Sequence, residues 1–211
     1  MQLSAIQQVA VTCFAQRGFA ATGIRELAAA VGLNSATLYH YVGGKEELLV
    51  GLIENCLDSM IAGAQRALST SADPLRQLAM LVAFHVGFTA SNPKTSRVAD
   101  HEMRALAPEN AARMQALRDA YERLFARTLE AGQAAGQLHA ADLGIARLAI
   151  MEMGTGTSHW YRPTGRLTLP EVQLNFVTLV MRMLGVADEH PLDAGELPIP
   201  PSLASEPEPK D

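Results

Sequence analysis

The sequence predicts an all-α protein, and three observations support this fold class. Ala, Leu, Met, Glu, Gln and Arg dominate the composition, and all of them have high helix propensity. Apolar residues recur at spacings of three and four, whereas no long stretch alternates between apolar and polar residues as a strand would. Gly, Pro, Asn and Ser interrupt this pattern where helices are expected to end. With 211 residues, of which 48% are hydrophobic, the chain can bury a core in one or two domains.

Three short helices are expected in the first 45 residues. The apolar face of the first has helical spacing: Ile6, Val9, Ala10, Cys13 and Phe14. Gly18 ends this helix, and Thr22 is a suitable N-cap for the second. The apolar face of the second follows the same spacing: Ile24, Leu27, Ala28 and Val31. Gly32 ends the second helix, and Asn34 or Ser35 caps a third helix of about two turns.

The rest of the chain is expected to be helical up to residue 184. The predicted helices span residues 45–70, 74–90, 95–106, 109–135, 141–160 and 168–184. Pro74 and Pro108 mark two of the starts, because proline is tolerated in the first turn of a helix. Residues 185–211 contain six prolines and seven acidic residues. Such a composition does not favour a packed core, so this tail is predicted to be mostly disordered.

The charge and the cysteines restrict the function only weakly. The net charge is −5, but residues 185–211 hold seven acids and one lysine, a charge of −6, so the remainder carries +1. This distribution neither supports nor excludes binding to nucleic acid.

Residues 1–4 do not resemble a signal peptide, and no apolar run reaches the ~18 residues of a membrane span, which predicts a cytoplasmic protein. Cys13 and Cys56 lie on apolar helical faces and are expected to be buried free thiols, with a redox switch as the alternative.

The stretch from Thr22 to Lys45, TGIRELAAAVGLNSATLYHYVGGK, carries the clearest functional pattern. Two short helices joined by a tight turn that contains glycine follow the helix-turn-helix plan. Leu38 and Val42, four residues apart, are expected to face inward. The side chains left to project outward are those of Ser35, Ala36, Thr37, Tyr39, His40 and Tyr41. Hydroxyl and small side chains of this kind suit contacts with phosphates and base edges, which predicts a recognition helix in the DNA major groove.

The segment from Ile6 to Leu48 resembles the N-terminal domain of the TetR family of transcriptional repressors. The resembling residues are Phe14, Gly18, Thr22, Ile24, Arg25, Leu27, Ala28, Gly32, Thr37, Leu38, Tyr39, Tyr41, Val42, Lys45 and Leu48. Residues 159–163 and 165–167 are also similar to a junction between two late helices in part of the family. The resemblance implies a helix-turn-helix domain over residues 1–48 and a larger helical effector-binding and dimerisation domain over residues 49–184. It also implies a dimer that binds a palindromic operator as a repressor and is released by a small apolar effector.

The resemblance also implies a set of DNA-contacting residues. Bases would be contacted by Arg25, Ser35, Ala36 and Thr37, and phosphates by Thr22, Tyr39, His40, Tyr41 and Lys45. Each has a simpler alternative. Tyr39 and Tyr41 could pack on the following helix, His40 could merely be exposed, and Arg25 could pair with a neighbouring glutamate. Residues 1–48 balance to zero charge, so a shallow salt dependence is expected.

Effector-binding residues are expected in the middle of the chain, where methionines and aromatics alternate with a few polar groups. The candidates are Met80, Phe84, His85, Phe88, His101, Arg104, Tyr121, Phe125 and Met151. Methionine adapts to irregular apolar ligands, and the polar members could orient one. The alternative for each residue is that it simply belongs to the core.

The helices over residues 141–160 and 168–184 are predicted to form the homodimer interface. The first carries small residues that permit close helix packing: Gly144, Ala146, Ala149, Gly154 and Gly156. The second offers an apolar face: Val172, Phe176, Leu179, Val180, Met183 and Leu184. Two such helices from each subunit would make a four-helix bundle. The alternative is that both helices pack only within one chain.

A catalytic or metal-binding protein is the competing class, with a structural helical protein as a third. His85 and His101, together with Asp100 and Glu102, could supply metal ligands or acid–base groups. Adjacent residues on a helix point about 100° apart, however, and rarely share one ion. The segment 154–158, GTGTS, matches neither a phosphate-binding loop nor a serine-nucleophile motif. We therefore predict no enzyme activity, no cofactor, no metal and no membrane partner.

Overall fold

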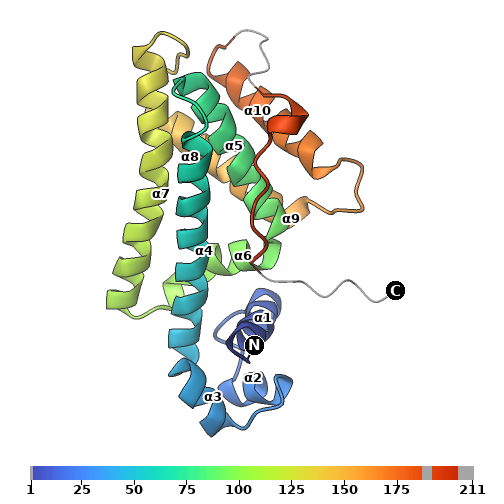
Figure 1. The fold of residues 1–211 in the computed structure, drawn as a ribbon. Helices are drawn as coiled ribbons and strands as arrows, with labels where there is room; N and C mark the ends of the chain where they lie inside the picture. Colours follow the sequence, from blue (N-terminus) through green and yellow to red (C-terminus); the bar gives the residue numbers. More distant parts are fainter. Residues whose placement is uncertain (1, 187–191, 204–211) are drawn as a thin grey trace. The chain divides into compact units, whose positions relative to one another are not determined.

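The computed structural model describes residues 2–186 and 192–203, and all regular structure in these residues is helical, as predicted (Figure 1). The elements are α1 (Gln2–Arg17), α2 (Ile24–Ala30), α3 (Ser35–Val42), α4 (Lys45–Leu68), α5 (Pro74–Ser91), α6 (Pro93–His101), η1 (Glu102–Ala105), α7 (Pro108–Ala134), α8 (Leu143–Thr155), α9 (Thr157–Trp160), α10 (Leu169–Met183) and η2 (Ala194–Glu196). Two predicted helices are each divided. The helix expected over 95–106 continues as a 3₁₀ turn, and that over 141–160 breaks at Gly156.

Local side-chain caps explain several helix starts. Asn34 accepts a hydrogen bond from the backbone N–H of Thr37, which begins α3 as predicted. Asp73 caps α5 in the same way. Thr168 and Glu171 form a capping box at α10. The predicted cap of the second helix is wrong, because its N-cap is Gly23 rather than Thr22.

The chain forms two compact units that do not follow chain order. Unit 1 comprises Met1–Asp58, Lys94–Leu117 and Ser202–Asp211, and unit 2 comprises Ser59–Pro93 and Arg118–Pro201. The helices α4 and α7 contribute residues to both. The predicted domain boundary at residue 48 follows the sequence motif. The compact units differ from it, because unit 1 also includes α6 and part of α7.

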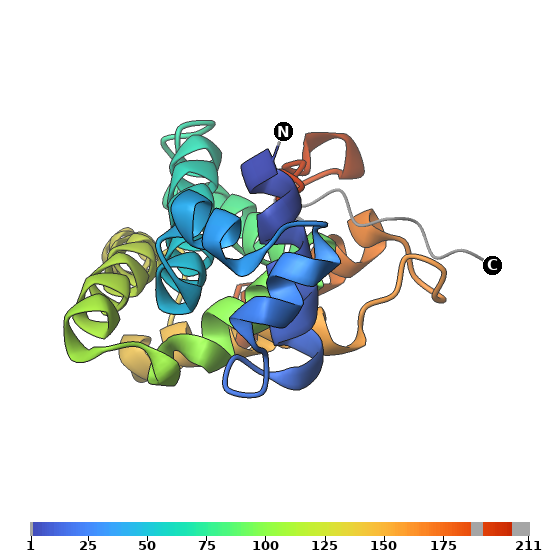
Figure 2. The ribbon, with the colours of Figure 1, turned by 90° about the horizontal axis from the view of Figure 1, so that it is seen from below.

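Unit 1 is built around α1, α2 and α3. Helix α2 contacts both α1 and α3 (Figure 2). Each of these helices inserts apolar side chains into the unit's core, which includes Phe14, Leu27, Leu38, Leu49 and Ile53. The predicted inward positions of the first two helices are confirmed at Ile6, Ala10 and Phe14 and at Leu27 and Ala28.

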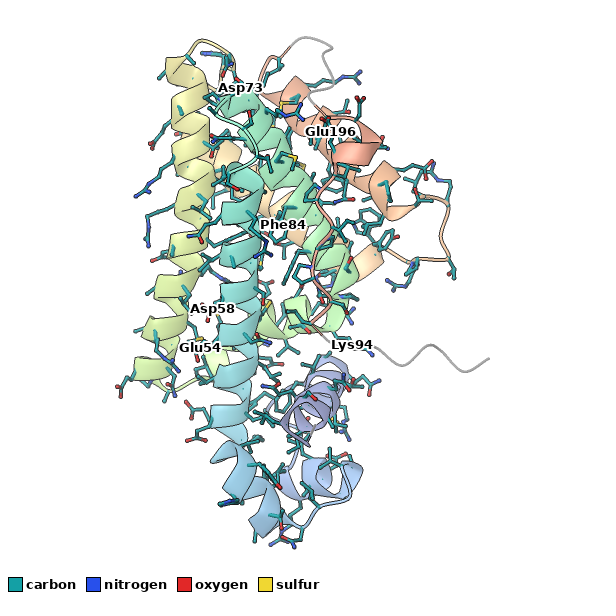
Figure 3. All side chains as sticks on the ribbon, in the orientation of Figure 1. Glu54, Asp58, Asp73, Phe84, Lys94 and Glu196 are labelled. Atoms are coloured by element: carbon teal, nitrogen blue, oxygen red, sulfur yellow. The ribbon has the colours of Figure 1, made fainter. Side chains whose placement is uncertain are left out.

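Unit 2 is built around α5, which contacts α8, α9 and α10. Every residue from Leu78 to Ala90 is buried, so α5 is a core helix enclosed on all sides rather than an amphipathic surface helix. Phe84 points from α5 toward α4 (Figure 3), where Gly63 leaves room for its ring. A Cβ atom on residue 63 would lie 2.1 Å from Phe84 Cζ.

The C-terminal tail differs from its predicted disorder over residues 192–203. Leu192 is buried, η2 follows, and the carbonyl oxygens of Pro198 and Pro201 accept hydrogen bonds from side chains of unit 2. Composition alone did not predict these contacts. Proline lacks a backbone N–H donor, but its carbonyl oxygen can still accept a hydrogen bond. The rest of the tail, 187–191 and 204–211, lies outside the described residues.

The cysteines are free thiols, with Cys56 buried and Cys13 partly exposed. None of the helices in the described ranges combines the length and the apolar character needed to cross a bilayer.

Candidate functional site

The exposed face of α3 is the first candidate site. Leu38 is its one buried residue and fixes the helix on unit 1, while Val42 is partly buried. The exposed positions are Ala36, Tyr39, His40 and Tyr41, and Ser35 and Thr37 are partly exposed. The tyrosine side chains remain 48% and 42% exposed. This exposure argues against the alternative that both rings are ordinary packing aromatics.

The turn between α2 and α3 holds this face in place. Gly32 has a φ of 69°, a left-handed conformation that a residue with a side chain rarely adopts. The backbone N–H of Leu33 returns to the carbonyl of Ala28 at 2.8 Å, and the Asn34 side chain then starts α3. The sequence therefore fixes the angle between the two helices locally.

Arg25 is exposed at the start of α2. Its neighbour Glu26 forms an ion pair with Arg17 instead. Within the ranges that the structure describes, Arg25 itself makes no ion pair. Its guanidinium is thus available to a phosphate or a base, which favours the predicted role over the local pairing.

Thr22 is corrected as a candidate for phosphate contact. Its side chain is 1% exposed, and its hydroxyl donates to the carbonyl oxygen of Gly18 at 2.9 Å. The hydroxyl therefore stabilises the loop between α1 and α2 and does not reach the surface. The sequence motif alone could not distinguish this buried role from a surface contact.

Lys45 is tied to the same loop. Its Nζ donates to the carbonyl oxygens of Phe19 and Thr22, both at 2.9 Å, and lies 4.1 Å from the centre of the Phe19 ring. Glu102 accepts the backbone N–H of Phe19 at 3.2 Å. Two of the three Lys45 donors are therefore engaged inside unit 1. Lys45 positions the loop, and only its remaining donor could reach a phosphate.

A second candidate site is the buried cluster around His85 in unit 2. The predicted residues Phe84, Phe88, Tyr121 and Phe125 are all buried in this unit, as is Met80, and Met151 is partly buried there. The His85 ring lies 5.8 Å from the Tyr121 ring and 5.9 Å from the Phe125 ring. The imidazole of His85 therefore packs against both aromatic rings.

The hydrogen bonds of His85 define its protonation state. Its Nε2 lies 3.1 Å from the carbonyl oxygen of Met151, which can only accept, so Nε2 carries the proton. Its Nδ1 then accepts from the Tyr121 hydroxyl at 3.1 Å. Burial lowers the pKa of His85 to about 4, so the ring is neutral at physiological pH.

His101 and Arg104 do not join this cluster. They belong to α6 and η1 in unit 1, and both are exposed. The His101 side chain lies 3.6 Å from Asp100, its sequence neighbour. The structure thus does not bring them into the His85 cluster, and their assignment as effector-binding residues stays a prediction.

The sequence interpretation missed a group of buried hydroxyls beside His85. Thr89 Oγ1 lies 2.7 Å from Thr157 Oγ1, and it donates to the carbonyl oxygen of Gly154 at 2.9 Å. A Cβ atom on residue 154 would lie 2.2 Å from His85 Cδ2. Gly154 therefore serves packing within unit 2 rather than the predicted dimer interface. The only local signal for these hydroxyls is the run of small and hydroxyl-bearing residues in the segment 154–158, GTGTS.

A cavity of about 250 Å³ lies where α9 leads into α10. Its lining comes from the predicted late junction, with one residue of α10 added at the end: Trp160, Tyr161, Arg162, Gly165, Arg166, Leu167 and Val172. Trp160 stacks on Phe176, with ring centres 6.2 Å apart and an interplanar angle of 15°. The volume is slightly below the range of about 300–1,000 Å³ that is usual for ligand pockets.

The predicted dimer helices expose several large apolar side chains. These are Ile145, Leu148 and Met153 on α8, Trp160 on α9, and Leu179 and Met183 on α10. Other predicted interface residues are instead buried within unit 2: Ala146, Gly154, Val172, Val180 and Leu184. Each helix thus has one face for its own unit and another that is apolar and exposed.

The competing metal site finds no support in the described residues. His85 and His101 belong to different units, and nowhere in residues 2–186 and 192–203 do three or more His, Cys, Asp or Glu side chains gather in a way that could hold an ion.

Two family models match most of the chain. The one described as bacterial regulatory proteins, tetR family, matches residues 6–52. The one described as tetracyclin repressor-like, C-terminal domain, matches residues 71–184. The first match covers α2 and α3, and the second covers the His85 cluster.

Curated and solved proteins agree with this result. The HTH-type transcriptional repressor KstR2 of Rhodococcus jostii (strain RHA1) is 26% identical over 184 residues, which cover 86% of this chain and 89% of that protein. A tetR-family regulatory protein from Rhodococcus RHA1 is 30% identical with a TM-score of 0.83, over 89% of this chain and 99% of its own. AibR, solved with isovaleryl coenzyme A and operator DNA, has a TM-score of 0.78 at 22% identity, over 87% of this chain and 98% of its own, and shows the fold alone.

Proposed function

Because this chain belongs to the TetR family of ligand-responsive DNA-binding transcriptional regulators, we propose that it represses transcription by binding a palindromic operator as a dimer. The observation that carries this proposal is α3. It is capped by Asn34, anchored by Leu38 and otherwise turned outward with hydroxyl-bearing and aromatic side chains. Such a regulator acts in the cytoplasm, where the operator DNA lies.

The contacts of α3 divide into two kinds. The first turn of α3 is the end of a recognition helix that contacts bases, and it holds Ser35, Ala36 and Thr37. We assign a further base contact to the guanidinium of Arg25 in α2. We assign phosphate contacts to Tyr39, His40 and Tyr41. Base contacts give specificity and phosphate contacts give position, so the two sets should respond differently to substitution.

The dimer is proposed to form through α8 and α10. Their exposed apolar side chains, Leu148 and Leu179 among them, would be covered by the same helices of a second copy. A twofold axis would then present two α3 helices to two half-sites, about one helical turn of DNA apart or a multiple of it.

The effector is proposed to act through unit 2, where the His85 cluster and the cavity beside Trp160 are found. Two regulators of similar fold suggest compounds to test. KstR2 of Mycobacterium tuberculosis is described as a ketosteroid regulator, and AibR was solved with isovaleryl coenzyme A. We propose a small, largely apolar effector that favours a conformation unable to hold the operator. We assign no catalytic activity to the chain.

Selection of bound DNA from a random pool tests this function. A palindrome should be enriched, and synthetic operator should then bind the dimer. Ala36→Glu should reduce operator affinity by about 100-fold or more, since it places a negative charge on the face proposed to enter the groove between two negatively charged phosphate backbones. Ala112→Glu is a matched control, because Ala112 is an exposed helical alanine of α7 in the same unit. Failure to enrich any sequence, or equal effects of both variants, would contradict the proposal.

A further inference from the structure

The described C-terminal segment Leu192–Leu203, here called the strap, lies along α5 (Figure 1). Its contacts advance in the same direction as α5. Glu196 pairs with Arg76 near the start of the helix, and the carbonyl oxygen of Pro201 accepts from Asn92 just after its end. Between them, Pro200 packs beside Gly87. The strap therefore follows the helix over its whole length.

Two buried amides recognise the strap backbone. Gln173 of α10, only 2% exposed, donates through Nε2 to the carbonyl oxygens of Ala83 at 2.9 Å and Pro198 at 3.2 Å. Asn92, only 4% exposed, donates through Nδ2 to the carbonyl oxygens of Phe88 at 3.0 Å and Pro201 at 2.9 Å. Each amide nitrogen carries two hydrogens, so it can donate one to a carbonyl of α5 and the other to the strap.

The chemistry of the two sides is complementary. Prolines offer no backbone N–H and favour an extended conformation, so their carbonyls are the groups that a partner can recognise. Gln173 and Asn92 provide donors for them, and Gly87 allows close approach. A Cβ atom on residue 87 would lie 2.6 Å from Gln173 Nε2 and 3.5 Å from Pro200 Cγ. These features distinguish a specific binding site from unspecific contact with an apolar surface.

The boundary between the two units falls within the strap. Its residues up to Pro201 belong to unit 2, whereas Leu203 belongs to unit 1. There Leu203 helps line a small cavity of about 40 Å³ with residues of α1, α4 and α6: Ser4, Gln7, Gln8, Val11, Leu52, Asn55 and Thr95. Unit 1 is the unit that carries α3. The family model for the C-terminal domain ends at residue 184, so the strap lies beyond the matched region.

We propose that the surface formed by α5 and α10 is a binding site for an extended proline-rich segment and that the strap is its occupant. Its seating there tethers unit 2, which carries the His85 cluster, to unit 1, which carries α3. A seated tether limits the arrangements available to the two units and so raises operator affinity by preorganisation. This inference rests on the proposed function, because its final readout is operator binding.

Pro200→Asp in the full chain tests the proposal, with Ile199→Asp as its matched control. Both introduce the same charge into neighbouring strap residues, but Ile199 is 94% exposed and Pro200 faces Gly87. Hydrogen exchange of peptides covering residues 192–203 reports seating, and operator titration reports the tether. We expect Pro200→Asp to accelerate exchange and weaken operator binding about fivefold or more, and Ile199→Asp to change neither beyond about twofold.

The outcomes separate the two proposals. Unchanged exchange in Pro200→Asp would overturn recognition of the strap, and faster exchange with unchanged operator affinity would overturn the tether. Absence of operator binding by the wild-type chain would instead contradict the proposed function, while exchange still reports seating. If Pro200→Asp fails to fold, a protease site inserted within residues 187–191 allows the folded wild-type helices to be cut from the strap. Co-elution of the two pieces supports recognition of the strap, and their separation overturns it.

Discussion

Helices α3 and α5 use their residues in opposite ways. Helix α3 buries only Leu38 and leaves most of its other side chains at the surface, whereas α5 buries every residue from Leu78 to Ala90. Helix α3 is thus a surface helix that one buried side chain fixes to its unit, whereas α5 is the central helix against which α8, α9 and α10 pack. Substitutions of the exposed residues of α3 should therefore change DNA binding with little change in stability, whereas substitutions in the core around α5 should lower the stability first.

Acidification should affect the α5 region first. His85 is buried and its pKa is lowered from 6.5 to about 4. Below pH 6.5 the unfolded chain binds a proton that the folded protein excludes until about pH 4, so the free energy of unfolding falls across this window. The expected loss is about 3 kcal/mol, since one pKa unit corresponds to about 1.4 kcal/mol.

Denaturant unfolding at about pH 7 and about pH 4.5 measures this loss. His85→Gln is the control, because glutamine can donate to the Met151 carbonyl and accept from Tyr121 but does not titrate. The difference in pH dependence between wild type and variant isolates His85 from the carboxylates. Identical pH dependence in the two proteins would show that the imidazole is not excluded from protonation.

A smaller effect is expected where α4 approaches α5. Gly63→Ala would place a Cβ atom 2.1 Å from Phe84 Cζ in a buried core, and overpacking of this kind costs about 1–3 kcal/mol. Gly51→Ala is the matched control in the same helix, since nothing lies within 4 Å of its Cβ position. It should stabilise the protein by about 0.5–1 kcal/mol through helix propensity.

The melting temperatures of both variants check this contrast. Addition of Phe84→Leu to Gly63→Ala should recover part of the loss, because the smaller side chain vacates the space near Gly63. A loss that is equal in both alanine variants would assign the effect to α4 itself and not to its contact with α5.

The same contrast explains how much the sequence revealed. Helix α3 was predictable because its cap at Asn34, its anchor at Leu38 and its outward residues all follow from local spacing. The roles of Thr22 and Lys45 depend on the fold of the loop between α1 and α2, to which both side chains donate hydrogen bonds, so their residue types alone suggested surface contacts. The motif predicts which segment binds DNA but not which of its polar groups are already used within the fold.

Around α5 the fold class was predictable but the partners were not. The methionines and aromatics indicated a core, yet the pairing of His85 with Tyr121 joins residues 36 positions apart, and Gln173 reaches Ala83 across 90. The strap shows the same limit, since its prolines indicate an extended chain and only distant amides give it a place to bind. Long-range complementarity of this kind has no local signature.

The smallest effects are expected from substitutions on the surface of α3. They test whether this surface distinguishes DNA base sequences or only contacts the DNA phosphates. Tyr39→Phe removes a hydroxyl assigned to a phosphate, so affinity for every DNA sequence should fall alike, by up to about tenfold. Thr37→Ala removes a group assigned to a base edge, so the preferred base at one position of each half-site should change, by about 1–3 kcal/mol. Titration of both variants against a set of single-position operator mutants measures the two patterns.

The melting temperature of both variants should match that of the wild type, because Tyr39 is exposed and Thr37 is partly exposed. The backbone N–H of Thr37 also donates to the Asn34 side chain that caps α3. Ala retains that N–H, so the cap and the helix start remain intact in Thr37→Ala. A uniform loss in Thr37→Ala would then mean that its hydroxyl contacts a phosphate, and the reading of bases would fall to Arg25, Ser35 and Ala36.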